Sequence, residues 1–429
     1  MSCRLATFGV KGLCGSDRWA KDRCIALAFS DCFGSYIGLI ATLILWKEKP
    51  PMATSSNKQE NAIAPVRLMG QGTEVWGMSS AERLRRMFAR LDIKDVAEWD
   101  GTAPTSETCF VVSADHVFAQ VLLADLSKQV GTVLTSEGRP VAAYVTSDRA
   151  ADIAQDIAEG QVSRASDLSL HEPDALSSAY DERLRKREVP YVMALASETV
   201  GAVEQRTFAG SYKGVTDFVT LYLWPKPAIA VVRWCAAARI TPNMVTSVSL
   251  VLVLAAMWLF WNGFFVSGIV AAWLMTFLDT VDGKLARVTV TSTKLGNVFD
   301  HGIDLIHPPF WYWAWVVGVM ATVDNPPDLT LALWVTVIGY VVQRLQEGIF
   351  IQSFKIEMHI WRRFDSLYRL VVARRNPNLA LLTVFAIAGL PAEGLIAVAL
   401  WTAVSLVVHS LQIWQAFRAV RPLQSWLDH

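Results

Sequence analysis

The sequence is poor in the residues that build disulfide frameworks and zinc sites. It has six cysteines in 429 residues, no Cys-x-x-Cys pair and only seven histidines. This composition argues against a disulfide-rich domain and a Cys/His zinc site, and it is typical of a reducing compartment. An excess of charge of one sign is also missing. Because 39 basic residues balance 39 acidic ones, nothing in the charge indicates a nucleic-acid partner.

Charged residues become scarce after about Arg239, and apolar runs take their place. Of the 17 tryptophans, 11 lie from Met244 onward. Long apolar runs rich in tryptophan are typical of membrane helices and their interfaces. The sequence therefore predicts a soluble module followed by an integral membrane module.

The segment 1–72 has no clear assignment. Ile25–Trp46 is mostly apolar, but it contains Asp31, has basic residues on both sides and is followed by no signal-peptidase-like site. Two interpretations stay open: an extra membrane helix, or a translation start at Met52, where an ordinary polar N-terminus would begin. Residues 52–72 are polar and irregular, and we expect a flexible lead-in there.

Residues 73–200 show alternating strand-like and helix-like patterns. Ser79 or Ser80 can cap a basic helix, and short apolar runs at 109–112, 131–135 and 141–145 read as strands, with helices expected at 115–128 and 147–159. This alternation predicts a small cytoplasmic α/β domain. Residues 201–240 read as a basic, amphipathic approach to the membrane, in which Pro225 and Pro227 would break any helix.

Six apolar segments within residues 241–420 predict a six-helix membrane domain; they lie at 244–261, 264–286, 296–321, 329–352, 378–390 and 394–417. The connections near 262, 323–328 and 389–394 contain no Lys or Arg, whereas the alternate connections are rich in both. By the positive-inside rule the basic side is cytoplasmic, so the soluble domain and the C-terminus would both lie there.

Acidic residues gather at the cytoplasmic ends of the second and third segments. Asp279 and Asp282 are three residues apart, and Gly296, Asp300 and Asp304 follow at intervals of four, so each set shares one helix face. Because a short loop makes the two helices antiparallel, the four carboxylates can meet.

Such a carboxylate cluster needs a compensating cation. One ionised Asp at mid-membrane costs about 2.5–3.5 kcal/mol on insertion scales, and neighbouring carboxylates repel each other. Oxygen ligands suit Mg²⁺, Mn²⁺ or Ca²⁺. A metal-dependent enzyme, a divalent-cation transporter and a non-catalytic membrane protein with an acidic metal site would all carry this pattern.

The spacing D-x2-D-G-x2-A-R-x8-G-x3-D-x3-D resembles the motif of the CDP-alcohol phosphatidyltransferase family. Its eight fixed positions are Asp279, Asp282, Gly283, Ala286, Arg287, Gly296, Asp300 and Asp304. The resemblance, over about residues 210–420, implies a six-helix membrane enzyme, often a homodimer. It would transfer a phosphoalcohol group from a CDP-linked donor to an alcohol acceptor in phospholipid biosynthesis and release CMP. With a cytoplasmic active site, we expect it in the bacterial inner membrane.

The resemblance also implies roles for individual residues. Asp279, Asp282 and Asp300 would hold Mg²⁺ or Mn²⁺ against the donor pyrophosphate. Asp304 would be the general base for the acceptor hydroxyl and could touch a second metal. For the substrate, Gly283 and Ala286 would leave room for the cytidine, and Arg287 would pair with phosphate or with the carboxylates; Asp279 and Gly296 belong to the same binding region.

Other polar residues carry weaker predictions. Lys213, Asp217 and Arg374 are candidate substrate contacts, although Arg374 also suits an interfacial anchor. Arg344 and Glu347, one turn apart, are predicted to form an internal ion pair. His301, His307 and His409 are expected to pack rather than to bind metal.

The soluble domain resembles, faintly, a sugar-phosphate nucleotidyltransferase, because C-F-V-V-S-A-D-H places Asp115 after a strand. The expected phosphate-binding loop with its Arg and its Pro-Lys is missing. A degenerate, non-catalytic nucleotidyltransferase-like domain and an unrelated binding or dimerisation module both stay open. The sequence does not decide whether the donor is CDP-diacylglycerol or a CDP-polyol.

Overall fold

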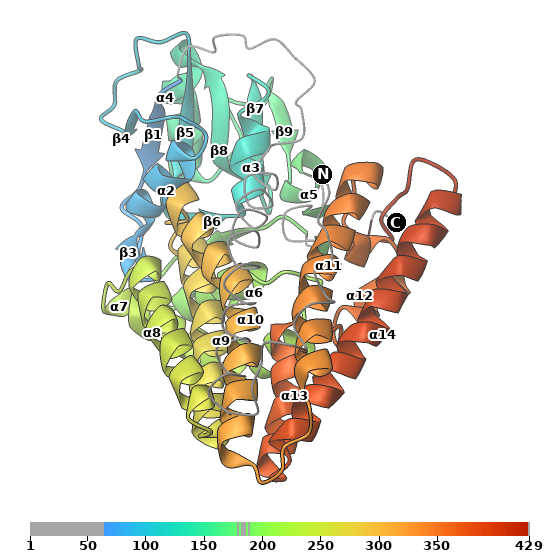
Figure 1. The fold of residues 1–429 in the computed structure, drawn as a ribbon. Helices are drawn as coiled ribbons and strands as arrows, with labels where there is room; N and C mark the ends of the chain where they lie inside the picture. Colours follow the sequence, from blue (N-terminus) through green and yellow to red (C-terminus); the bar gives the residue numbers. More distant parts are fainter. Residues whose placement is uncertain (1–63, 178–179, 182–185, 188, 428–429) are drawn as a thin grey trace.

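The computed structural model of the chain describes residues 64–427 except 178–179, 182–185 and 188. The N-terminal part of this range is an α/β domain, and the C-terminal part is mostly helical (Figure 1). The interpretations of Ile25–Trp46 and of a start at Met52 fall outside the described residues.

A mixed six-stranded sheet forms the centre of the α/β domain, with strand order β4-β1-β5-β8-β7-β9. Its strands are β1 (Val66–Met69), β4 (Val96–Glu98), β5 (Thr108–Ser113), β7 (Thr132–Ser136), β8 (Arg139–Thr146) and β9 (Ser169–His171). β1 runs parallel to β4 and β5, whereas β8 runs antiparallel to both of its neighbours, β5 and β7. The three predicted strands are present, and β5 and β8 are almost wholly buried.

Two predictions for this domain were wrong. The predicted irregular lead-in to residue 72 contains β1, a central strand whose four residues are too few for a clear alternation in the sequence. The predicted helix 115–128 is a turn at Asp115, a strand β6 (His116–Phe118) and a shorter helix α3 (Gln120–Leu126). β6 forms because it pairs with β12 (Val192–Ala194), about 75 residues later, a partner that local periodicity does not reveal.

The remaining elements of the α/β domain are short and connect or cover the sheet. They are β2 (Glu74–Val75), β3 (Met78–Ser79), α2 (Ser80–Ala89), η2 (Ser147–Arg149), α4 (Ala150–Glu159), α5 (Pro173–Leu176), β10 (Tyr180–Asp181) and β11 (Lys186–Arg187). The Ser79 side chain caps α2 by accepting from the amide of Glu82 at 3.2 Å, as one of the two predicted caps.

The connection to the bundle consists of α6 (Val200–Gly210), a short π-helical turn η3 (Val219–Leu223) and α7 (Pro225–Ala237). The expectation that Pro225 and Pro227 break any helix was wrong. Both lie in the first turn of α7, where a proline costs no hydrogen bond because the first amides of a helix have no intrahelical acceptor.

Helices occupy all six segments that were predicted to span the membrane; they are α8 (Pro242–Trp261), α9 (Phe265–Val288), α10 (Lys294–Thr322), α11 (Thr330–Phe354), α13 (Arg375–Ile387) and α14 (Pro391–Arg418). Among the described residues, α8, α9 and α14 are long and apolar enough to cross a membrane. α13 has 13 residues, about 20 Å of helix, which is less than the hydrocarbon thickness of a bilayer. Short elements η4 (Met358–Ile360) and α12 (Arg363–Tyr368) link α11 to α13.

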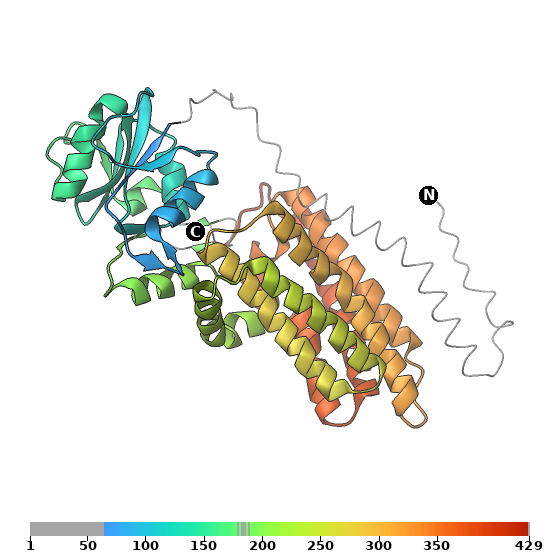
Figure 2. The same cartoon turned by 90° about the vertical axis from the view of Figure 1, so that its left-hand side faces the viewer.

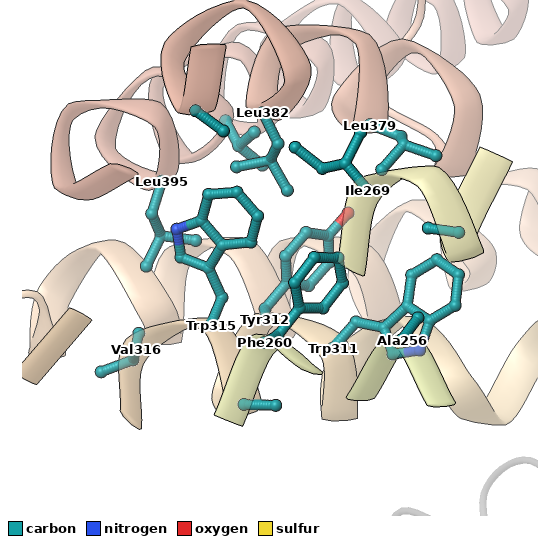
Figure 3. Packing of buried hydrophobic residues seen from close by; sticks show 14 of the residues in the cluster. Ala256, Phe260, Ile269, Trp311, Tyr312, Trp315, Val316, Leu379, Leu382 and Leu395 are labelled. Atoms are coloured by element: carbon teal, nitrogen blue, oxygen red, sulfur yellow. The ribbon is translucent and has the colours of Figure 1, made fainter. Parts of the chain in front are cut away.

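Aromatic side chains hold the bundle together at its centre (Figure 3). Trp311 and Trp315 of α10 pack against Phe260 of α8, and Leu379, Leu382 and Leu395 cover them from α13 and α14. Each indole also has a partner: Trp311 donates to the Val253 carbonyl at 3.0 Å, and Trp315 donates to the Pro391 carbonyl at 2.8 Å. This core fixes α10 against helices on both sides.

The α/β domain lies at one end of the bundle, next to the turn from α9 to α10 (Figures 1 and 2). Val290 in that turn belongs to the same buried apolar cluster as the strands of the soluble domain. The motif helices therefore end directly against the soluble domain.

Candidate active site

Asp279 and Asp282 lie on α9, three residues apart, as the motif predicts. Asp282 is 3% exposed, and one of its oxygens accepts a hydrogen bond from the Thr246 hydroxyl of α8 at 2.6 Å. Asp279 is less enclosed, with a side chain that is 17% exposed. The two carboxylates thus share a face, but Asp282 is fixed by the neighbouring helix.

Asp304 lies on α10 just before two prolines in the helix interior, Pro308 and Pro309. A proline has no amide hydrogen, so the carbonyls of Asp304 and Leu305 lose their usual donors four residues later. The Tyr340 hydroxyl of α11 donates to the Asp304 carbonyl at 3.2 Å and reaches the Leu305 carbonyl at 3.4 Å. Tyr340 therefore holds the backbone of α10 where Asp304 is displayed.

Arg375, at the start of α13, joins the two motif helices. Its guanidinium forms an ion pair with Asp279 at 2.5 Å and a second ion pair with Asp304. The Arg375 side chain is 18% exposed, so both contacts are mostly shielded from water. A positive charge thus lies between carboxylates of α9 and α10, where the sequence predicted that a cation is needed.

Asp300 precedes Asp304 by one turn of α10, and its side chain lies outside the described part of the structure. Among the side chains that the structure describes, no three carboxylate, thiol or imidazole groups lie close enough to hold a metal ion. Of the three described motif carboxylates, Asp279 and Asp304 share Arg375, whereas Asp282 bonds to Thr246. The predicted metal set therefore stays a prediction.

The small residues of the motif differ in what surrounds them. A Cβ atom on Gly296 would lie 2.9 Å from the Asn243 side chain of α8, so glycine permits close helix packing there. A Cβ on Gly283 would meet only the Arg287 guanidinium, at 3.5 Å or more, within the described structure. Ala286 is half-buried one turn later. Packing thus explains Gly296, whereas at Gly283 the open space suits a ligand.

Arg287 reaches back to the juxtamembrane connection. It donates to the Ser211 carbonyl at 3.0 Å, and Lys284 donates to the same carbonyl at 3.2 Å. Lys284 also lies over the ring of Tyr212, 3.3 Å from its centre. Arg287 is therefore held beside Gly283 by the end of α6, and Lys213 lies half-buried two residues beyond Ser211.

Asp217 is buried and linked to α13 rather than exposed to a ligand. It accepts from the Asn376 amide at 2.9 Å and from the amide and hydroxyl of Thr220 at 3.0 and 2.8 Å. Burial alone would raise the pKa of the Asp217 carboxyl, but Arg369, Asn376 and Thr220 outweigh it and lower the pKa. Asp217 therefore positions the residue that follows Arg375.

Arg374 points to a different cluster from Arg375. It pairs with Glu347 of α11 and lies 3.2 Å from the His359 ring. The predicted ion pair between Arg344 and Glu347 is confirmed, at 3.3 Å. Of the histidines expected to pack, His307 donates from Nδ1 to the Ile303 carbonyl at 2.7 Å, and His409 is fully buried. The side chain of His301 lies outside the described structure.

Sequence reasoning missed Arg375, Tyr340 and Thr246 as parts of the site. Arg374 was predicted as a candidate contact, but the adjacent Arg375 looks the same in a sequence, and it is Arg375 that pairs with Asp279 and Asp304. The Pro308–Pro309 pair was a usable signal, because two prolines inside a helix leave carbonyls that need another donor. Thr246 gave no local signal, since a single threonine in an apolar helix commonly bonds to its own backbone.

Comparison with known proteins agrees with the motif. Residues 239–414 match the family model of the CDP-alcohol phosphatidyltransferases. No curated protein matches the chain. The matched range contains α8 to α14 almost completely, with Asp279, Asp304 and Arg375 inside it. Residues 239–414 are therefore similar to the CDP-alcohol phosphatidyltransferases, and this match implies that the chain is a phosphotransferase.

Proposed function

We propose that this chain transfers a phosphoalcohol group from a CDP-linked donor to an alcohol acceptor, with a divalent metal ion, and releases CMP. The observation that carries the proposal is the convergence of Asp279 and Asp304, from the two motif helices, on one positive charge. Carboxylates at this depth need a cation, and a substrate pyrophosphate brings more negative charge that needs the same compensation.

The residues present fit Mg²⁺ or Mn²⁺. Asp279, Asp282 and Asp300 would hold the metal, since carboxylate oxygens are the ligands that both ions prefer. Arg375 supports this assignment, because its guanidinium shows that a positive charge is accommodated between Asp279 and Asp304. When bound, the metal would neutralise charge that develops on the phosphate and on the leaving CMP.

Asp304 suits the role of general base. Its side chain is 38% exposed, compared with 17% for Asp279, so an acceptor hydroxyl can approach it more easily. A base must come within hydrogen-bond distance of the proton that it removes. The ion pair with Arg375 fixes the position of this carboxylate in the free protein.

For the donor, Gly283, Ala286 and Arg287 would form the cytidine and phosphate contacts. The space beside Gly283 supports this assignment, and Arg287 offers a planar set of donors that suits phosphate oxygens. Asp279 and Gly296 complete this region. Lys213 and Arg374 are candidates for contacts with the acceptor end, since both lie near the cytoplasmic face of the bundle in the predicted topology.

The topology belongs to the same proposal. Six membrane helices, with α13 as a short one, would place the soluble domain, the carboxylates and the C-terminus on the cytoplasmic side of a bacterial inner membrane. The distribution of Lys and Arg among the connections supports this orientation. We also expect a homodimer, as the family resemblance implies.

CMP release tests the function. The purified full-length chain in detergent should release CMP from CDP-diacylglycerol or from CDP-inositol when Mg²⁺ and a polyol, polyol phosphate or lipid alcohol are present, and should stop when EDTA is added. Mass spectrometry of lipids from cells with and without the gene would then identify the product. Transport of a divalent cation into vesicles without CMP release would overturn the proposal.

For the soluble domain we propose a degenerate nucleotidyltransferase-like module without catalysis. The loop after β1 packs against the side chain of Asp115. The Gly72 amide donates to the Asp115 carboxylate at 2.9 Å, and a Cβ atom on Gly70 would collide with the same carboxylate. A phosphate-binding loop needs free amides. The full-length chain should therefore release no pyrophosphate from CTP and a polyol phosphate, and steady release would make the protein bifunctional.

A further inference from the structure

The motif helix α9 ends against α2 of the α/β domain. A helix leaves its last carbonyls without intrahelical donors, and these groups need partners when they are buried. At the end of α9 the partners come from α2 of the soluble domain. Arg83 donates to the Val288 carbonyl, and Arg86 donates to the Thr289 carbonyl at 2.9 Å.

The two arginines are also well placed electrostatically. The C-terminal end of a helix carries partial negative charge, so cations beside it are stabilising. Arg83 is 7% exposed, which makes it a buried cation whose interaction with this helix end is little screened by water. Arg86 is fixed from a second side by Glu82, at 2.8 Å on its own helix.

The turn after α9 is held by its side chain as well. Val290 has a φ of +55°, a left-handed conformation that is strained for a β-branched residue. Its side chain is 7% exposed and lies in the same apolar cluster as Leu84, Met87 and Phe88 of α2. A strained backbone persists only where its surroundings hold it, and here the surroundings are the soluble domain.

A third link is the apolar cluster along the side of α9. Val281, Leu285 and Val288 share a buried cluster with Val75 and Trp76 of the β2–β3 hairpin. Val281 directly precedes Asp282, and Val288 is six residues beyond it, about 9 Å along the helix axis at 1.5 Å per residue. The β2–β3 hairpin and the motif segment of α9 therefore belong to one buried apolar cluster, which α6 and α7 also line.

We propose that Arg83 is a positioning residue for the transferase, through which the soluble domain fixes the end of α9 and so the position of Asp279 and Asp282 relative to α10. The inference rests on the proposed function for its kinetic consequence. It gives the soluble domain a role that needs no catalysis of its own. A small displacement of α9 would separate its carboxylates from Asp304 across the helix pair.

Kinetics of full-length variants test the proposal. Arg83→Met keeps an unbranched apolar stem and removes the hydrogen bond to the Val288 carbonyl. On whichever of CDP-diacylglycerol and CDP-inositol the wild type uses, we expect kcat per folded molecule to fall about 10- to 100-fold. The KM for the donor should change much less, because Arg83 bonds to the end of α9 and is not among the proposed substrate contacts. Arg83→Lys, which keeps a donor, should recover part of kcat.

Arg86→Met is the second variant, because Arg86 is half-exposed and its loss should not prevent folding. Arg85→Met is the matched control: Arg85 lies on the same helix and, among the described residues, makes no hydrogen bond to α9. We expect a smaller fall in kcat for Arg86→Met and wild-type kcat for Arg85→Met. Wild-type kcat in folded Arg83→Met, or in folded Arg86→Met if the first variant does not fold, would overturn the proposal.

Hydrogen exchange separates this inference from the proposed function, since it needs no substrate. Amides of residues 285–292 should exchange faster in Arg83→Met and Arg86→Met than in the wild type and in Arg85→Met. If the wild type releases no CMP, the proposed function fails and exchange alone decides. Unchanged exchange in both variants would then show that α2 does not hold the end of α9.

Discussion

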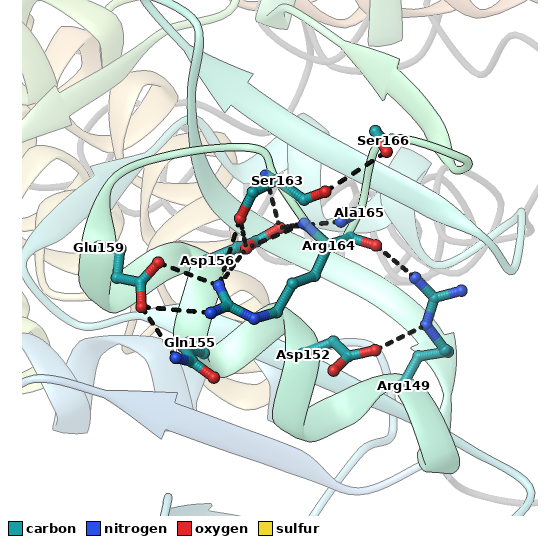
Figure 4. A network of polar contacts seen from close by, with 9 residues as sticks. All are labelled: Arg149, Asp152, Gln155, Asp156, Glu159, Ser163, Arg164, Ala165 and Ser166. Carbon is teal, nitrogen blue, oxygen red and sulfur yellow. Dashed lines mark hydrogen bonds and ion pairs between the residues drawn. The ribbon is translucent and has the colours of Figure 1, made fainter.

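The two halves of the molecule bury carboxylates in different ways. In the soluble domain, Asp156 of α4 is fully buried and receives its hydrogen bonds from the loop just beyond its own helix: the amides of Ser163, Arg164 and Ala165, the Ser163 hydroxyl and the Arg164 guanidinium (Figure 4). In the bundle, Asp279 and Asp304 share one guanidinium, which comes from Arg375, 96 and 71 residues away in the sequence.

The difference distinguishes a carboxylate that stabilises the fold from carboxylates that can bind a ligand or take part in a reaction. Local backbone amides cannot move away without unfolding the loop, so Asp156 is permanently satisfied and has no capacity for a ligand. A long arginine side chain can move, and a metal ion or a substrate proton can take its place at Asp279 or Asp304. Carboxylates that are held by a distant, flexible cation are therefore the ones to test for catalysis.

The largest effect should come from a motif carboxylate. Asp300→Asn keeps the volume and removes a proposed metal ligand, so turnover should fall to background while the thermal unfolding of the bundle stays close to that of the wild type. CMP release and thermal unfolding measure the two properties. Asp324→Asn, an exposed change at the other end of α10, is the control. Near-normal CMP release by Asp300→Asn would remove Asp300 from the metal site.

Asp304 should behave differently from Asp279. If Asp304 is the base, Asp304→Asn should lose about 10²- to 10⁴-fold in turnover and still bind the donor. Equilibrium binding of the CDP-linked donor, measured beside CMP release, distinguishes the roles. An equal loss of donor affinity would make Asp304 chiefly a metal ligand.

Substitution of Arg375 tests whether a metal ion can replace its guanidinium between Asp279 and Asp304. Arg375→Met leaves two carboxylates without their partner and should lower the stability of the metal-free protein by up to about 3 kcal/mol. Saturating Mg²⁺ should restore most of this loss, which thermal unfolding in EDTA and in Mg²⁺ would measure. In Arg374→Met, whose partner Glu347 is outside the motif, Mg²⁺ should restore little. Equal losses with and without Mg²⁺ would contradict this view of Arg375.

The smallest expected effect on activity concerns Asp156. Asp156→Asn replaces an acceptor oxygen by a donor that faces backbone amides, and it should destabilise the soluble domain by about 1–3 kcal/mol. Activity per folded molecule should be unchanged, because the network lies away from α2. Chemical unfolding and CMP release of the same preparation would measure both. A large loss of turnover per folded molecule would contradict the view that Asp156 is structural whereas Asp279 and Asp304 act in the reaction.

The same residue predicts a pH dependence. Burial alone would raise the pKa of Asp156, but the hydrogen bonds from Ala165, Ser163 and Arg164 outweigh it, so its pKa is lowered. A folded pKa below the unfolded value of about 3.9 stabilises the domain at higher pH, and this stabilisation is lost as the pH falls through the folded pKa. The wild type should therefore lose stability more steeply than Asp156→Asn below about pH 5.

The sequence by itself determined the parts of this protein that depend on local spacing. Helical periods of three and four residues put Asp279 with Asp282 and Asp300 with Asp304, and runs of apolar residues located all six helices of the bundle. The family match over residues 239–414 agrees with the same motif. Ser79 as the cap of α2 and the Arg344–Glu347 pair were likewise predictable, because both contacts lie within one helical turn.

Tertiary structure decided whatever depends on contacts between distant segments. It selected Arg375 over Arg374 for the carboxylates, joined Tyr340 to the carbonyls that Pro308 and Pro309 leave without donors, and paired β6 with β12. It also placed Arg83 at the end of α9, 205 residues later in the chain. No local pattern encodes such contacts, because the free energy that selects them comes from packing whole elements together and appears only when the chain has folded.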